Sequence, residues 1–174
     1  MTTEAIARLL KPLSAPLGVY AVLGNHDFSD DAPRMAAALR AAGIAVLDNR
    51  SRVLASGPLT LVGIGDTYSH NADPRKALAG VRGGALCFTH SPDVFPQLPA
   101  SCLLTVAAHT HGGQVRLPLL GRPAVPFVSI YGQRYAAGLI REGGKTLFVS
   151  TGLGTSGLTV RFGVTPEVSL LEIQ

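Results

Sequence analysis

Apolar residues recur along the chain at the spacings typical of helices and of strands. This pattern predicts a first helix that begins at Thr3 and ends before Pro12. It predicts a second helix that is capped by Asp31 and followed by Gly43. Between the two helices, residues 18–23 have the continuous apolar character of a buried strand. The resulting order of helix, strand, loop and helix is typical of the α/β class.

Further strands are predicted downstream, with a brief helix at residues 74–79 between them. They fall at residues 44–47, 52–55, 59–64, 85–90 and 103–111. Residues 134–140 and 145–150 then predict a hairpin around the turn at residues 142–144. Residues 167–173 alternate between polar and apolar, which predicts a last, half-buried strand.

Composition bounds the fold and excludes some functions. A chain of 174 residues, with 47% hydrophobic and 15% charged residues, can bury one sizeable core, so we expect a single domain over residues 1–174. The net charge is +4, but the basic residues are scattered singly and form no patch for a nucleic acid or a membrane. Mild positive charge suits a small anionic substrate.

The N-terminus and the cysteines indicate the compartment. No basic leader precedes an apolar block, and no apolar run reaches the roughly 18 residues that a bilayer requires. The chain as given is therefore expected to be cytoplasmic, without a transmembrane segment. Cys87 and Cys102 each lie in an apolar run, so we expect small buried side chains rather than a metal pair or a disulfide.

Four of the five histidines follow the ends of predicted strands: His26, His90, His109 and His111. Ligand sites of α/β sheets gather outside the carboxyl ends of the strands, so these histidines could share one cleft. If the strand continues through His109 and His111, both rings point to one face and could serve one metal or two adjacent metals. With the amide oxygen of Asn25, they form a mixed nitrogen and oxygen set that suits Mn, Fe, Zn or Ni.

Three motifs occur in a fixed order: GNHD (24–27), THSPDVFP (89–96) and AHTHGGQ (108–114). Together with YGQRYAAGL (131–139), they resemble the last three motifs of the calcineurin-like metallophosphoesterases, in a bacterial phosphodiesterase branch. The resemblance runs from about Leu17 to the C-terminus. It implies an α/β fold in which a β-sandwich is flanked by helices.

The resemblance also implies roles for the motif residues. It makes Asn25, His90 and His109 ligands of one divalent metal and His111 a ligand of a second. His26 would be the catalytic histidine that contacts the phosphate and protonates the leaving oxygen. Asp27 would hold the imidazole of His26 in position. The implied reaction is hydrolysis of a phosphoester, with a phosphodiester favoured, by in-line attack of a metal-bound hydroxide.

This sequence departs from the family pattern in two places. Ala108 stands where the family usually has Gly, and the upstream Asp-x-His and Gly-Asp-x-x-Asp motifs, with their strands, are missing before Gly24. We therefore expect a domain that is N-terminally truncated relative to the family, holds at most one metal well and has impaired activity. Asp66, in GIGDTY, resembles a Gly-Asp box out of order and is interpreted as a strand-end turn. Gly112, Gly113 and the glycine-rich residues 151–157 could let the backbone approach a ligand, but ordinary turns are the favoured interpretation.

Two other functions stay open. One is a non-catalytic domain that binds a single metal or a phosphorylated ligand, and the other is an interaction protein without a metal. If the chain is an enzyme, the resemblance implies a small phosphoester substrate, with lipid-linked and nucleotide-containing compounds as candidates. Relatives in this branch are often membrane-associated through segments upstream of the catalytic domain.

Overall fold

The computed structural model describes residues 1–55, 59–123 and 128–173. The helices and 3-10 turns are α1 (Thr3–Leu10), α2 (Asn25–Asp30), α3 (Ala32–Ala41), α4 (Pro74–Ala77), η1 (Pro92–Gln97), η2 (His111–Gly113) and η4 (Gly132–Tyr135). The strands are β1 (Val19–Ala21), β2 (Ile44–Val46), β3 (Arg50–Val53), β4 (Thr60–Ile64), β5 (Ala85–Thr89), β6 (Cys102–Ala107), β7 (Gly138–Glu142) and β8 (Lys145–Val149). None of the helices in the described ranges is long and apolar enough to cross a bilayer.

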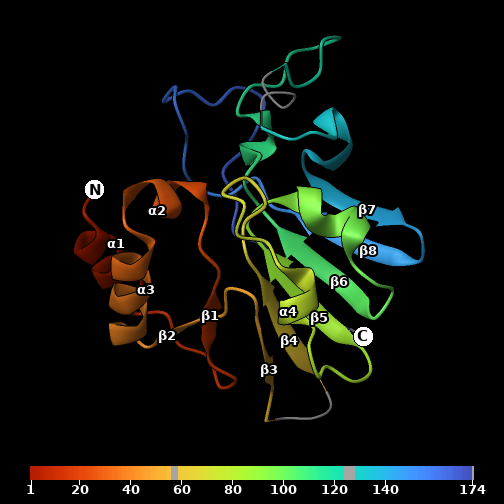
Figure 1. Ribbon diagram of the computed structural model, residues 1–174. Coiled ribbons are helices and arrows are strands. Elements are labelled where there is room, and N and C mark those ends of the chain that lie inside the picture. Colours follow the sequence, from red (N-terminus) through yellow and green to blue (C-terminus); the bar gives the residue numbers. More distant parts are fainter. Residues whose placement is uncertain (56–58, 124–127, 174) are drawn as a thin grey trace.

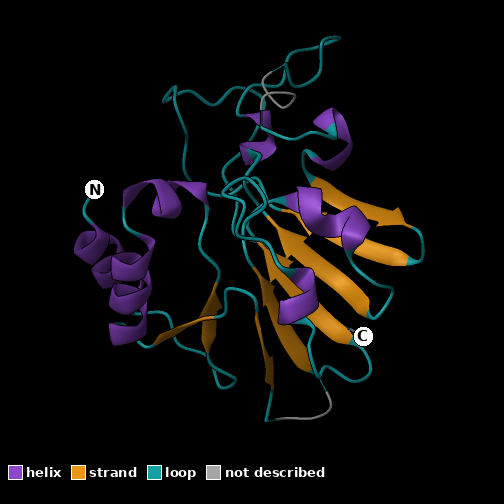
Figure 2. Cartoon of the chain, in the orientation of Figure 1, coloured by secondary structure: helices purple, strands orange, loops and turns teal. Residues whose placement is uncertain are grey.

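Two sheets form the centre of the molecule. A six-stranded sheet has the order β3-β4-β5-β6-β8-β7, and β1 pairs with β2 in a second, parallel sheet. The four inner strands of the larger sheet run parallel, while β3 and β7 are antiparallel at its edges. Figure 2 shows helices on both sides of these strands. The predicted α/β class, with a central sheet flanked by helices, is confirmed.

The alternation of side chains along β4 explains how the layers pack. Leu61 lies in an apolar cluster with Tyr20 of β1 and Phe88 of β5, so this face of the larger sheet packs against the smaller sheet. Val62 and Ile64 point to the opposite face, where they pack with Ala77 of α4. In Figure 1 the layers follow one another from α1 and α3, through the two sheets, to α4.

The predicted N-terminal helices and strand are confirmed with small shifts of their bounds, but the loop predicted between the strand and α3 contains an additional helix, α2. The Asp31 side chain accepts a hydrogen bond from the backbone N–H of Arg34 at 3.0 Å and caps α3, as its position suggested. Met35 and Leu39 of α3 are buried against Leu23. This packing holds the residues after β1, which include the GNHD motif, beside the sheets.

Two predictions about strands are wrong. The strand predicted at residues 103–111 ends at Ala107, so His109 and His111 do not lie on it. Both have positive φ angles, 65° and 52°, which turn the backbone away from a strand. The strand predicted at residues 167–173 is absent from the described chain, where Val168 and Leu170 are exposed.

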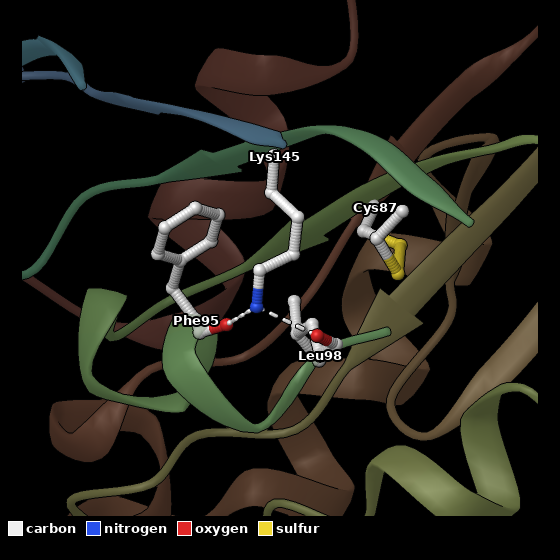
Figure 3. The surroundings of a disulfide bond; sticks show 5 residues. Cys87, Phe95, Leu98 and Lys145 are labelled. Carbon is white, nitrogen blue, oxygen red and sulfur yellow. Dashed lines mark hydrogen bonds between the residues drawn. A yellow bond between two sulfur atoms is a disulfide. The ribbon is translucent and has the colours of Figure 1, made fainter. Parts of the chain in front are cut away.

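The expectation that Cys87 and Cys102 are separate thiols is also wrong, because the two are joined in a disulfide. The two cysteines lie on the neighbouring strands β5 and β6, and their Cα atoms are 5.8 Å apart, within the usual range for such a bond. Figure 3 shows the disulfide near Leu98, and beside it the Lys145 amino group, which donates hydrogen bonds to the Phe95 and Leu98 carbonyls. The expectation of burial itself is confirmed, since both cysteines are fully buried.

Candidate active site

Parallel strands deliver the candidate residues to one edge of the larger sheet. His90 comes directly after β5, and His109 comes two residues after β6. The backbone N–H of Ala108 donates to the carbonyl of His90 at 2.9 Å, which ties the two strand ends together. The prediction that histidines from distant parts of the sequence meet at the strand ends therefore holds for this pair.

Three donor atoms converge at this edge. His90 Nε2 lies 2.9 Å from Asn25 Oδ1 and 3.0 Å from His109 Nδ1. Because His109 Nε2 donates to the carbonyl of Val128 at 3.0 Å, its Nδ1 carries a lone pair. A single proton on His90 Nε2 cannot satisfy both neighbours, so at least one of these close contacts joins two lone pairs.

This donor set fits a divalent cation. Ligands of a tetrahedral zinc lie about 2.1 Å from the metal and thus about 3.4 Å from one another, slightly more than the separations here. Two imidazole nitrogens and an amide oxygen also suit Mn, Fe or Ni. In the described part of the chain, no group of three His, Cys, Asp or Glu side chains gathers in this way, so the third donor of the set is the amide of Asn25.

The surroundings keep the imidazoles neutral, which is the form that binds metals. Burial, and to a smaller extent the charge of the neighbouring His109, lowers the pKa of His90 to about 4. Burial also lowers the pKa of His109, against the opposing effect of the Asp66 carboxylate. The pKa of His111 is lowered by burial as well.

A glycine allows α2 to approach this cluster. A Cβ atom on Gly24 would lie 2.7 Å from both Cε1 and Nδ1 of His90, closer than side chains pack. Asn25 begins α2, so its amide is presented by the first helical residue. Asp27 Oδ2 accepts a hydrogen bond from the Gly24 N–H at 2.8 Å. This contact corrects the expected role of Asp27, because the carboxylate caps the helix instead of holding His26.

His26 lies at the exposed side of the cluster. Its Nε2 is 2.9 Å from the hydroxyl of Ser156, which comes from the glycine-rich residues 151–157. His111 lies near the same segment, with Nδ1 3.1 Å from the carbonyl of Gly154. Residues 151–157 therefore form one wall of the site, which agrees with the less favoured of the two sequence interpretations, an approach of this backbone to a ligand.

A cavity of about 290 Å³ opens between these groups. Its lining includes four of the predicted site residues: Asn25, His26, His109 and His111. Tyr68, Gln114 and Ser156 also line it and were not predicted. Of these, Gln114 belongs to the quoted AHTHGGQ motif, so its position there was an available signal. Its amide donates to the Ser156 carbonyl at 3.0 Å and links η2 to the wall.

Curated relatives indicate a family. The chain is 33% identical to "Phosphodiesterase YaeI" of Escherichia coli over 98% of its own length and 63% of that protein. It is 28% identical to "Uncharacterized metallophosphoesterase YkuE" of Bacillus subtilis, over 98% of its own length and 61% of that protein. These names support the calcineurin-like metallophosphoesterase superfamily, which the sequence motifs also resemble.

Other comparisons limit what this similarity says about function. A protein of Chlamydia trachomatis, "UDP-2,3-diacylglucosamine pyrophosphatase LpxG", is 25% identical over 98% of the chain and 68% of its own length. The chain spans 63% and 61% of the lengths of YaeI and YkuE, less than two thirds of each. No family model and no solved structure matches it.

A residue of the THSPDVFP motif supports the cluster indirectly, through the segment that His109 contacts. Asp93, in THSPDVFP, is buried and accepts hydrogen bonds from the Ser129 hydroxyl at 2.6 Å and the Ile130 N–H at 3.0 Å. These bonds fix the segment whose Val128 carbonyl receives the His109 proton. Asp93 therefore helps to set which nitrogen of His109 faces the cluster.

Proposed function

We propose that this chain forms the cation-binding and phosphate-binding part of a metal-dependent phosphodiesterase. The observation that supports this proposal best is that His90 Nε2 lies within 3.0 Å of both Asn25 Oδ1 and His109 Nδ1. Similarity to proteins named phosphodiesterase and metallophosphoesterase supplies the reaction class, which is phosphoester hydrolysis.

Each site residue has a proposed role. Asn25, His90 and His109 hold one divalent cation, which would act as a Lewis acid and lower the pKa of water to supply a nucleophile at neutral pH. His26 is exposed at the cavity, so it can contact the phosphate and give a proton to the leaving oxygen. The Ser156 hydroxyl, 2.9 Å from His26 Nε2, orients this imidazole in place of Asp27.

His111 is proposed as a ligand of a second cation. Its Nδ1 contacts the Gly154 carbonyl, which leaves Nε2 as the donor atom. A single imidazole holds a divalent ion weakly against water, so the first cation is expected to bind more tightly. That difference favours, as a second candidate function, a domain that binds one cation and a phosphorylated ligand without turnover.

The substrate is proposed to be a small phosphoester. The name of the chlamydial relative describes a pyrophosphatase of a lipid-linked nucleotide. Lipid-linked and nucleotide-containing phosphoesters are therefore the compounds to test first. The cavity of about 290 Å³ is near the lower limit of small-molecule sites, which suits a phosphoryl group with part of its substituents.

Turnover of bis-p-nitrophenyl phosphate in the presence of Mn²⁺ tests the proposal, with the monoester p-nitrophenyl phosphate as the comparison. We expect hydrolysis of the diester to exceed that of the monoester. His26→Ala should reduce kcat by about a hundredfold or more while cation binding persists. Cation binding with no turnover of either ester would instead support the second candidate function.

A further inference from the structure

Asp66 has a buried carboxylate oxygen without a partner. The residue lies two positions after β4 and is 0% exposed. Oδ2 accepts hydrogen bonds from the N–H and the hydroxyl of Ser69, at 2.7 and 2.8 Å. Oδ1 has no hydrogen-bond partner within the described ranges, and neither has the hydroxyl of the next residue, Thr67. Leaving a buried carboxylate oxygen unpaired is costly, so this arrangement indicates an additional partner.

Asp66 lies beside the cluster of donors. Ile64 of β4 is opposite Thr89 of β5, so Asp66 and His90 leave neighbouring parallel strands at the same edge. Tyr68 follows Asp66 by two residues, and the centroid of its ring lies 5.2 Å from the centroid of the His109 ring. The Asp66 carboxylate also acts on the pKa of His109, where it opposes the larger effect of burial.

Other carboxylates near the cluster are already engaged. Asp27 binds the Gly24 N–H and Asp48 binds the Leu23 N–H, both through backbone hydrogen bonds. Both oxygens of Asp93 are occupied by the segment around Ser129. The ion pairs found within residues 1–55, 59–123 and 128–173 do not involve Asp66. Its carboxylate is thus left without a described cationic partner.

The donor set needs such a charge. An asparagine amide and two neutral imidazoles carry no negative charge, and a divalent cation in a buried site is poorly stabilised by neutral donors alone. A carboxylate near the ligands can offset the charge of the cation and raise its affinity without binding it directly. Asp66 has both the burial and the unpaired oxygen that this role requires.

We propose that Asp66 is a positioning residue of the cation site, which supplies the negative charge that compensates a divalent cation held by Asn25, His90 and His109. This inference rests on the proposed cation site and adds a residue outside the three motifs. The interpretation of Asp66 as a turn residue covers its Oδ2, which binds Ser69, and leaves Oδ1 for the cation site.

Asp66→Asn tests the proposal because it removes the charge and keeps an oxygen for Ser69. We expect the affinity for Mn²⁺ or Zn²⁺, measured by calorimetry, to fall about tenfold or more, as for other residues that support metal ligands. In chelator, the same variant should unfold in urea at a concentration equal to or above that of the wild type, because a buried charge has been removed.

Asp73→Asn is the matched control, since Asp73 is an exposed carboxylate that caps α4 through the Lys76 N–H. Its cation affinity should stay within about twofold of the wild type. Asp66→Glu, which keeps the charge, should bind the cation more tightly than Asp66→Asn and remains informative if the latter does not fold. Binding by Asp66→Glu as weak as that by Asp66→Asn would overturn the proposal.

The outcomes separate this inference from the proposed function. Wild-type affinity in Asp66→Asn, together with its loss in His109→Ala, would overturn the role of Asp66 and leave the cation site intact. Without metal, Asp66→Asn could lose as much stability as Ser69→Ala while it keeps the wild-type cation affinity. That result would show that Asp66 is a turn residue and nothing more. A wild-type chain that binds no cation would overturn both proposals.

Discussion

Replacing Gly24 with Ala should displace His90 and weaken the cation site. The new Cβ would lie 2.7 Å from Cε1 and Nδ1 of His90, whereas ordinary contacts begin at 3.4 Å. The ring or the helix must therefore move by at least about 0.3 Å to reach the shortest contacts that side chains make, and by about 0.7 Å to reach an ordinary contact. Gly24 has φ −107° and ψ 174°, which Ala adopts freely, so the expected effect is steric and not conformational.

This displacement is large relative to the tolerance of a metal site. Ligand distances in such sites hold within about 0.2 Å, so a shift of about 0.3–0.7 Å takes His90 Nε2 out of position. We expect the affinity for Zn²⁺ to fall about tenfold or more. The free energy of unfolding in chelator should fall by about 1–3 kcal/mol, as is usual for overpacking.

Calorimetric titration with Zn²⁺ and urea unfolding in chelator measure the two effects. Gly154→Ala is the matched control, since a Cβ there meets no atom within 4 Å and its φ is not positive. The control should match the wild type in both measurements. Unchanged affinity and stability in Gly24→Ala would refute the close packing of α2 against His90.

Three further predictions concern stability, measured by urea unfolding. The lowered pKa of His90, about 4, keeps it neutral in the folded chain while the unfolded chain is protonated below about pH 6.5. The metal-free protein should therefore be most stable above pH 6.5, and its free energy of unfolding should fall by up to about 3 kcal/mol as the pH falls to 4. The same fall in pH should cost His90→Gln less. Reduction of the disulfide, which closes 15 residues, should cost about 3 kcal/mol, and Cys87→Ala/Cys102→Ala should not respond to reductant. Lys145→Met should cost about 1–3 kcal/mol, because it removes the donor to the Phe95, Pro96 and Leu98 carbonyls, and Lys145→Arg should cost less.

Elements with local signals were predictable from the sequence. α3 carries its own capping residue, Asp31, and is followed by Gly43 with φ 86°, so both of its ends depend on adjacent residues. The hairpin of β7 and β8 was likewise predictable, since its turn contains two glycines, Gly143 and Gly144, with positive φ.

Features that depend on tertiary contacts were not predictable. The end of β6 before His109 accompanies a positive φ angle at that residue, and the pairing of Cys87 with Cys102 depends on strand register; residue patterns determine neither. The alternation at residues 167–173 suits a strand, but the described chain offers it no partner strand.

The same distinction between local signals and tertiary contacts applies to the candidate site. Asn25, His90 and His109 were predictable because they follow strand patterns and match family motifs, and the structure brings them together. Ser156 and the Val128 carbonyl come from loops without a distinctive pattern, so only folding shows their place beside His26 and His109. Asp66 had a motif-like sequence, but its unpaired Oδ1 is visible only in three dimensions.

The location of a bound cation tests the central claim most directly. Crystals of the protein soaked in Mn²⁺ should give an anomalous diffraction peak about 2.0–2.3 Å from Asn25 Oδ1, His90 Nε2 and His109 Nδ1. A peak at another place, or none at a saturating concentration, would contradict the cation site on which the proposed function depends.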